Sequence, residues 1–214
     1  MAANKAVAAS LCLCLMIVTC KRSESDRALI EAVTRGDAAL VTSLLAKGAR
    51  PNAREETGIQ RTALIIAAGE DNEEIAVALV KAGADVNARA ADGSTALMYA
   101  AAEGNEPILR LLLAKGADSR AKDNTGQTAL IKAASAGHAA ACAILLDHGS
   151  DMEAADKAGH TALMKAIING RDDAAALLRS RGAALTDRQR QIIENALRTQ
   201  EGGEEIETED ESRT

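Results

Sequence analysis

Four short stretches recur at one spacing in this chain: Thr62-Ala-Leu-Ile, Thr95-Ala-Leu-Met, Thr128-Ala-Leu-Ile and Thr161-Ala-Leu-Met. The step from each stretch to the next is constant, which gives the sequence a period of 33. A single copy would carry no information, since threonine, alanine and leucine are common residues. Four copies in one register indicate an internal repeat, in which each unit buries its apolar face by stacking on its neighbours.

Glycines repeat in the same register. One set stands where the second helix of each unit should stop: Gly83, Gly116, Gly149 and Gly182. A second set precedes these positions at a constant offset and should end the first helix in the left-handed conformation: Gly36, Asp71, Gly104, Gly137 and Gly170. Asp71 adopts that conformation less readily than glycine does. The step from Gly48 to Gly83 exceeds the period by two, so two residues are inserted in the first connection, within 54–58.

The residues of one unit predict two helices and a projecting turn. The repeated threonine stands at an N-cap position, and the alanine and leucine after it place an apolar face inward. Ile108, Leu111 and Leu112 give the second helix an apolar stripe. The stretch 117–126 is rich in turn-forming residues and predicts a hairpin-like finger.

The period of 33 and the Thr-Ala-Leu opening resemble the ankyrin repeat family, whose units open with a related T-P-L-H motif. The resemblance covers about residues 26–185, which corresponds to about five repeats. It implies an all-α solenoid of helix-turn-helix repeats with hairpin fingers. It also implies a non-enzymatic protein that binds another protein through its fingers and first helices, without a cofactor.

The two ends of the repeat array read as caps. Residues 25–50 lack the Thr-Ala-Leu motif. Thr186 and Gln189 match a capping box in front of an amphipathic stretch, so we expect a closing helix over 186–198. The repeat domain with this helix should cover 26–198. Residues 199–214 hold seven acidic residues and one arginine, and we expect them to form a disordered acidic tail.

Residues 1–22 are typical of an export signal. Lys5 is followed by an uncharged run that ends at Cys20. Residues 17–20 resemble a bacterial lipoprotein signal, in which Cys20 would become the lipidated first residue of a periplasmic, membrane-anchored protein. Cleavage by an ordinary signal peptidase near Val18 or Ser25 would release the protein instead. An apolar helix packed on the repeats is a third interpretation.

Composition and residue placement favour binding over catalysis. The net charge of −6 gives no positive field for nucleic acid. His138, His148 and His160 are too widely spaced for one metal site, and we expect Cys142 to be a core thiol. Asp85, Asp118 and Asp151 should be turn residues. We therefore predict no catalytic residue, no metal site and no enzymatic activity.

Positions that vary between otherwise similar repeats are the candidates for a binding surface. They lie in the first helices and in the fingers: Tyr99, Lys132, Lys165, Arg89, Asp92, Asp123, Asn124, Lys157 and His160. Tyr99 is the single aromatic residue, and tyrosine is favoured in binding hot spots. An equally good interpretation is that it shields a seam between repeats. The charged residues could equally be ordinary solvated surface.

The sequence thus predicts an exported protein–protein interaction module of the bacterial cell envelope. We expect a monomer with a protein partner of unknown identity, no contact with nucleic acid, and no membrane contact other than the lipid on Cys20. The alternatives are a secreted effector or toxin-neutralising protein, and an accessory of an envelope redox enzyme.

Overall fold

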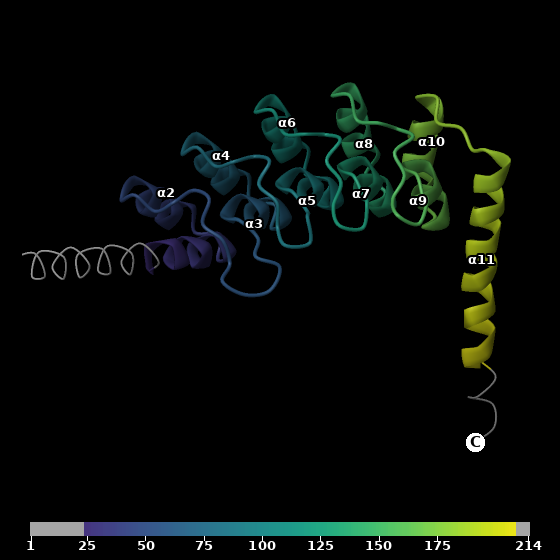
Figure 1. The fold of residues 1–214 in the computed structure, drawn as a ribbon, viewed down its shortest axis with the longest axis horizontal. Helices are drawn as coiled ribbons and strands as arrows, with labels where there is room; N and C mark the ends of the chain where they lie inside the picture. The colour runs from purple at the N-terminus through teal and green to yellow at the C-terminus, as the bar shows by residue number, and fades with distance from the viewer. Residues whose placement is uncertain (1–23, 209–214) are drawn as a thin grey trace, which may run out of the picture. The chain divides into compact units, whose positions relative to one another are not determined.

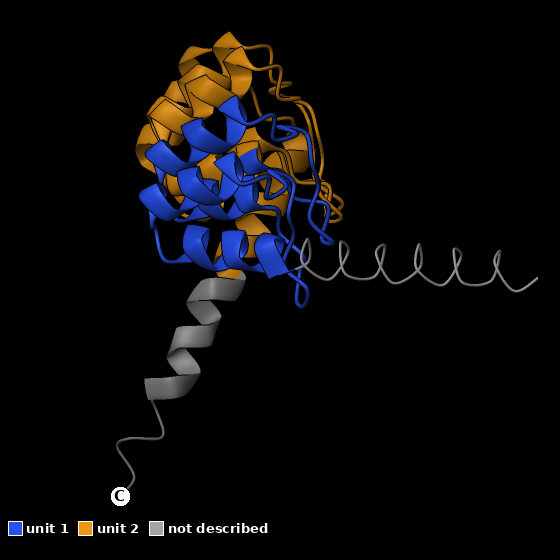
Figure 2. Ribbon diagram, turned by 90° about the vertical axis from the view of Figure 1, so that its left-hand side faces the viewer, with its two compact units in different colours: residues 1–96 blue, residues 97–214 orange. Residues whose placement is uncertain are grey.

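The computed structural model describes residues 24–208. Helices are the regular secondary structure of this range, and turns and loops connect them; the described residues contain three isolated β-bridges and no strand. The chain divides into two compact units at the boundary between residues 96 and 97 (Figure 2). The predicted export signal over 1–22 lies outside the described residues. Among the described residues, no helix is both long and apolar enough to span a membrane.

Helices follow one another in pairs, as the repeat predicts (Figure 1). Unit 1 contains a helix over residues 24–34, then α2 (Ala38–Ala46), α3 (Ala63–Gly69) and α4 (Glu73–Lys81). Unit 2 is built from α5 (Ala96–Glu103), α6 (Glu106–Ala114), α7 (Ala129–Ala136), α8 (Ala139–Asp147), α9 (Ala162–Ile168), α10 (Asp172–Ser180) and α11 (Asp187–Thr208).

The repeated threonine begins the first helix of a repeat. Thr62, Thr128 and Thr161 are the N-caps of α3, α7 and α9, and each hydroxyl accepts a hydrogen bond from the backbone N–H three residues later, at 3.3–3.4 Å. Such a bond satisfies one of the backbone donors that a helix start leaves without a partner. The predicted N-cap role is confirmed at these three positions.

The turn between the two helices of a repeat needs a left-handed residue. Gly104, Gly137 and Gly170 have φ values of +74°, +95° and +63°, as predicted. Asp71 occupies the same position with φ +56°, and this conformation costs a non-glycine residue about 1–2 kcal/mol. The tight reversal places the second helix against the first.

The same glycines set how closely neighbouring repeats approach. A Cβ added to Gly104 would lie 2.5 Å from the ring of His138, and one added to Gly137 would lie 2.9 Å from Arg171 Cδ. His138 and Arg171 occupy one repeat position, directly after the turn glycine. His138 therefore packs on Gly104 and Arg171 on Gly137, in each case on the turn glycine of the preceding repeat. His138 makes no side-chain hydrogen bond that caps α8.

Alanine, leucine and isoleucine make up most of the core of each unit, with valine added in unit 1 and methionine and Cys142 in unit 2. Leu64, Ile65 and Ile66 of α3 are fully buried in unit 1, as are Leu109 and Leu112 of α6 in unit 2. Alanines on the first helices, such as Ala133 and Ala134, are also buried and let the helices lie close together. Each contact between such small side chains contributes little to stability. The core is therefore stabilised by many contacts, made at the close packing that is usual inside proteins.

Fingers connect one repeat to the next. Isolated antiparallel bridges close three of them: Arg54 with Thr62, Arg89 with Thr95, and Ala155 with Thr161. Asp85, Asp118 and Asp151 each accept the backbone N–H two residues later at 2.9–3.0 Å, which confirms their role as turn residues. In unit 2 adjacent fingers are also joined directly, because the Lys157 N–H donates to the Thr125 carbonyl at 2.9 Å.

A capping box opens the last helix, as predicted. The Thr186 hydroxyl accepts the Gln189 backbone N–H at 3.3 Å, and Gln189 Oε1 accepts the Thr186 N–H at 2.8 Å. α11 then packs on α9 and continues to Thr208, beyond the expected end at residue 198. Glutamate-rich sequence is compatible with helix, which accounts for the extension into 199–208. Residues 209–214 of the acidic tail lie outside the described residues.

Candidate protein-binding surface

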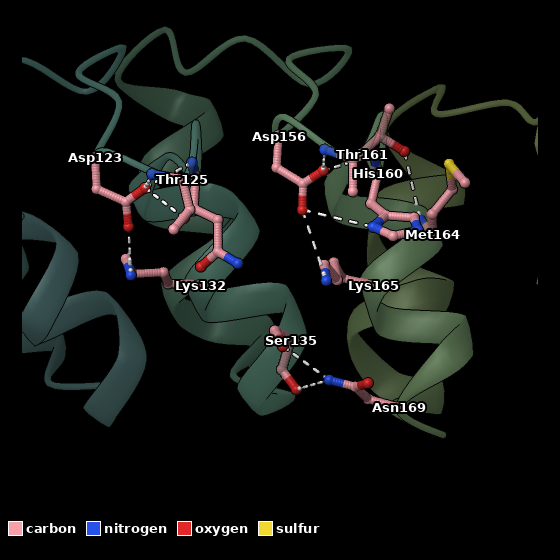
Figure 3. Close-up of polar contacts among 12 residues, drawn as sticks. Asp123, Thr125, Lys132, Ser135, Asp156, His160, Thr161, Met164, Lys165 and Asn169 are labelled. Carbon is pink, nitrogen blue, oxygen red and sulfur yellow. Dashed lines mark hydrogen bonds and ion pairs between the residues drawn. The ribbon is translucent and has the colours of Figure 1, made fainter. Parts of the chain in front are cut away.

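Two fingers of unit 2 are tied to the first helix of their own repeat by a carboxylate and a lysine (Figure 3). Asp123 Oδ2 lies 2.8 Å from Lys132 Nζ, and the side chain of Asp123 is only 5% exposed. Its other oxygen, Oδ1, accepts hydrogen bonds from the Thr125 N–H, the Thr125 hydroxyl and the Gln127 N–H at 2.7–2.9 Å. One buried carboxylate therefore holds the finger closed and fixes it to α7.

The next finger repeats the arrangement in a looser form. Asp156 Oδ1 accepts the N–H groups of Ala158 and His160 at 2.9 Å, and Lys165 Nζ lies 3.6 Å from Oδ2. His160 Nδ1 also lies 3.6 Å from Oδ2, which is too long for a hydrogen bond, and this buried nitrogen has no hydrogen-bond partner (Figure 3). Ala158 and His160 stand where the tighter finger has Thr125 and Gln127.

Hydrogen bonding decides the ionisation of Asp123. Burial by itself would raise the pKa of this carboxyl, but the bonds from Lys132, Thr125 and Gln127 outweigh burial and hold the pKa below its ordinary value. The carboxylate thus stays charged at neutral pH and keeps Lys132 in place. The preceding repeat has Ala90 and Tyr99 at these two positions, so the ion pair belongs to the later repeats.

These contacts divide the predicted binding residues into groups. Arg89, Asn124 and Lys157 are exposed on the fingers. Lys132 and Lys165 lie partly buried against their aspartates, with side chains 23% exposed, so they support fingers. Asp123 is buried, and the remaining candidates are partly exposed: Asp92, Tyr99 and His160. Their predicted contact with a partner stays a prediction.

The first finger, residues 54–61, is built differently because it carries the insertion. Glu55 and Arg61 form a two-pronged ion pair, with Arg61 Nη2 at 2.8 Å from Glu55 Oε1 and Arg61 Nε at 3.1 Å from Glu55 Oε2. The Arg61 hydrogen bond holds the pKa of the Glu55 carboxyl below its ordinary value. Arg54 Nη1 donates to the Arg89 carbonyl of the next finger at 2.6 Å and to the Gln60 carbonyl at 3.2 Å.

An apolar side chain is exposed at the tip of the first finger. Ile59 is 40% exposed, while the Ala91 N–H donates to its carbonyl at 2.7 Å. Gln60 beside it has φ +53°, a conformation that costs a side-chain-bearing residue about 1–2 kcal/mol. A cleft of about 210 Å³ adjoins the finger, lined by Asp26, Arg27, Ile30, Arg50, Arg54, Glu55 and Glu56.

A second hollow in unit 1 lies between the second helices α2 and α4. It has a volume of about 530 Å³ and is lined by Thr42, Leu45, Ala46, Glu74, Val77, Ala78, Lys81 and Ala82. The lining is mostly apolar, and its polar side chains are those of Thr42, Glu74 and Lys81.

The described residues contain no cluster of histidine, cysteine and acidic side chains that could hold a metal ion. Cys142 is buried, and burial raises the pKa of its thiol to about 12, so it is a core residue as predicted. His148 Nδ1 lies 2.8 Å from the Ile144 carbonyl within its own helix.

The model of the family described as "Ankyrin repeats (3 copies)" matches residues 29–123 and 115–189. The chain belongs to the ankyrin repeat family. A search of curated proteins found none that matches the chain. The match confirms the resemblance drawn from the four Thr-Ala-Leu stretches and the predicted class, an all-α ankyrin-repeat fold. Ankyrin repeats make this chain a protein–protein interaction module.

The insertion was visible in the sequence, but its consequence was not. The lengthened step from Gly48 to Gly83 located the longer finger. Neither the Glu55–Arg61 pair nor the exposure of Ile59 follows from that step, because both depend on the path of the finger and on its contacts with Arg89 and Ala91. Within residues 24–208, no regular finger holds a large apolar side chain that is equally exposed.

Asp123→Asn should destabilise the protein at neutral pH by about 1–3 kcal/mol, the effect of losing a buried charge-assisted hydrogen bond. The pKa of Asp123 is lowered in the folded state, so its stabilisation is present above its unfolded pKa of about 4 and disappears as the pH falls through the folded value. Urea unfolding of both proteins at several pH values measures this difference.

Asp151→Asn is the matched control. Asp151 is exposed and its carboxylate accepts the Glu153 N–H, so the substitution should change stability by less than about 0.5 kcal/mol. A difference between wild type and Asp123→Asn that stays constant from pH 7 to pH 3 would show that the Asp123–Lys132 pair is not the cause.

Proposed function

We propose that this ankyrin protein is an exported, non-enzymatic scaffold of the bacterial cell envelope that holds a protein partner against its fingers. The observation that carries the binding role is the construction of the fingers. Their carboxylates and backbone groups are bonded within and between fingers. The fingers also present the exposed residues Arg89, Asn124 and Lys157. A framework fixed in advance loses little conformational entropy on binding.

The absence of catalytic chemistry is part of the proposal. Among the described residues, the single free cysteine has a raised pKa, and the histidines His138 and His148 are engaged in packing and in a contact with their own helix. Ankyrin-repeat proteins are typically scaffolds, and these local contacts agree with that role. We therefore propose binding without a cofactor.

Export is supported by residues 1–22 alone. The uncharged run after Lys5, the cysteine at its end and the basic pair that follows are the pattern of a cleaved signal, with Cys20 as the residue that takes the lipid. Only Cys142 follows Cys20 in the chain, so the remaining sequence can form no internal disulfide in an oxidising compartment.

Cys20→Ala should move the protein from the membrane fraction to the soluble fraction of a bacterial cell that processes lipoproteins. The reason is that a single acylated residue would be its anchor, and Cys142→Ala serves as the matched control that keeps the signal intact. Fractionation followed by mass spectrometry of the mature N-terminus measures both effects. Membrane recovery that the Cys20 substitution leaves unchanged would refute the anchor, and a mature end at Ser25 would indicate free secretion.

The binding role is tested by affinity capture from envelope extracts with the full chain as bait. A triple substitution of exposed finger residues, Arg89→Ala with Asn124→Ala and Lys157→Ala, should reduce the captured partner by at least about tenfold. A triple substitution on second helices, Arg110→Ala with Lys115→Ala and Arg179→Ala, should leave it unchanged. Equal capture by both variants would contradict binding through the fingers.

A further inference from the structure

We infer that the first finger, residues 54–61, is the element that selects the partner, by placing the Ile59 side chain in an apolar pocket with a basic rim on a protein surface. This inference rests on the proposed protein-binding function and makes it specific.

The position of the first finger sets it apart from the others. It holds the two inserted residues that break the spacing of 33, and those residues enlarge a connecting loop while the flanking helices α2 and α3 keep their repeat positions. The two inserted residues therefore change the surface of the protein and leave its core as it is. Surface loops are where binding residues are most often found.

Several hydrogen bonds hold the backbone on both sides of Ile59. Arg61 and Glu55 close the finger by two side-chain contacts and by the Glu55 N–H to the Arg61 carbonyl at 3.0 Å. Arg54 and Ala91 then join it to the neighbouring finger on either side of the tip, at the Arg89 and Ile59 carbonyls. The tip is therefore held in one conformation before a partner arrives, which lowers the entropy lost on binding.

An exposed isoleucine alone is common on protein surfaces and needs no explanation. Here the neighbouring residue is Gln60, whose backbone is left-handed. The regular fingers have a left-handed glycine at this position, Gly93, Gly126 or Gly159, so the first finger differs by carrying a side chain in a conformation that side chains rarely adopt. Backbone strain of this kind persists where surrounding contacts enforce it, and it is frequent at binding sites. Among residues 24–198, whose exposure the structure describes, the only other large apolar side chain of comparable exposure is Leu40, which lies on the regular helix α2.

The charge of the tip indicates the character of the pocket. The Glu55 carboxylate is occupied by Arg61, whereas Glu56 is exposed, and no ion pair or hydrogen bond of its side chain is found in the described part of the chain. Glu56 also lines the adjoining cleft of about 210 Å³. A lysine or arginine at the rim of the partner's pocket would meet this carboxylate while Ile59 fills the pocket.

Site-specific photo-crosslinking in the native host tests the inference. A benzoylphenylalanine replaces Thr57, which is exposed and leaves Ile59 in place, and a second protein carries the same probe at Lys157 on a regular finger. The Thr57 probe should give a discrete protein adduct. Ile59→Asp should weaken that adduct about tenfold or more, which corresponds to about 1.4 kcal/mol of binding free energy, and Glu56→Lys should weaken it as well.

Two matched variants separate docking from folding. Leu40→Asp introduces the same charge at the other exposed apolar residue and should leave the adduct within about twofold of wild type, as should the conservative Ile59→Leu. Thermal unfolding of purified Ile59→Asp should match that of the wild type, because the side chain lies outside the core.

Each contrary outcome has a distinct meaning. A Thr57 adduct that Ile59→Asp leaves unchanged, or an adduct formed with lipid in place of protein, overturns the inference. An adduct from the Lys157 probe without one from Thr57 also overturns it, while the protein-binding function stands. The absence of a protein adduct from both probes contradicts the inference and the proposed function together.

Discussion

In unit 2, adjacent repeats meet at the glycine that turns the chain between the two helices of a repeat. The turn residue is left-handed in order to reverse the chain, and at Gly104 and Gly137 it also lacks a Cβ, so that a side chain of the next repeat can lie on it. At Gly104 that side chain is the ring of His138, and at Gly137 it is the stem of Arg171. Close approach at the turn lets small aliphatic residues fill the space between helices. A core with neither phenylalanine nor tryptophan has no larger side chains with which to fill a wider gap.

The fingers are held in shape by polar contacts, whereas the helices are held together by apolar packing. Loops bury little apolar surface, so carboxylates and backbone groups fix their shape, as Asp123 does for the finger that precedes α7. The Asp156 finger keeps the aspartate and the lysine but loosens their contact, and the first finger replaces them with the Glu55–Arg61 pair. A side chain that holds a finger in shape is less available to contact a partner. Lys132 and Lys165 have this supporting role, whereas Lys157 is exposed on its finger.

The sequence predicted most of the fold and little of the surface. Periodicity located the threonine caps and the left-handed turns including Asp71, and the local motif of Thr186 and Gln189 located the capping box. These features depend on local hydrogen bonds and backbone conformation. The partial burial of Lys132 could not be predicted, since the contact depends on the preceding finger folding back to bring Asp123 against α7. For the same reason Ile59 gave no signal beyond the break in the period. The sequence predicts a closing helix that ends at residue 198, whereas α11 runs to Thr208. The difference arises because acidic composition alone does not distinguish a helix from an unfolded tail.

Contact at the turn glycine, together with its left-handed backbone, holds neighbouring repeats of unit 2 together. Comparing the urea unfolding of Gly104→Ala with that of Gly149→Ala separates the contact from the backbone conformation. Both glycines are left-handed, but an added Cβ meets the His138 ring at Gly104 and nothing within 4 Å at Gly149. We expect Gly149→Ala to cost about 1–2 kcal/mol and Gly104→Ala to cost clearly more, with the excess removed when His138→Ala is added. Equal costs for the two glycines, with no coupling to His138, would show that the contact between the Gly104 turn and the His138 ring does not hold these repeats together.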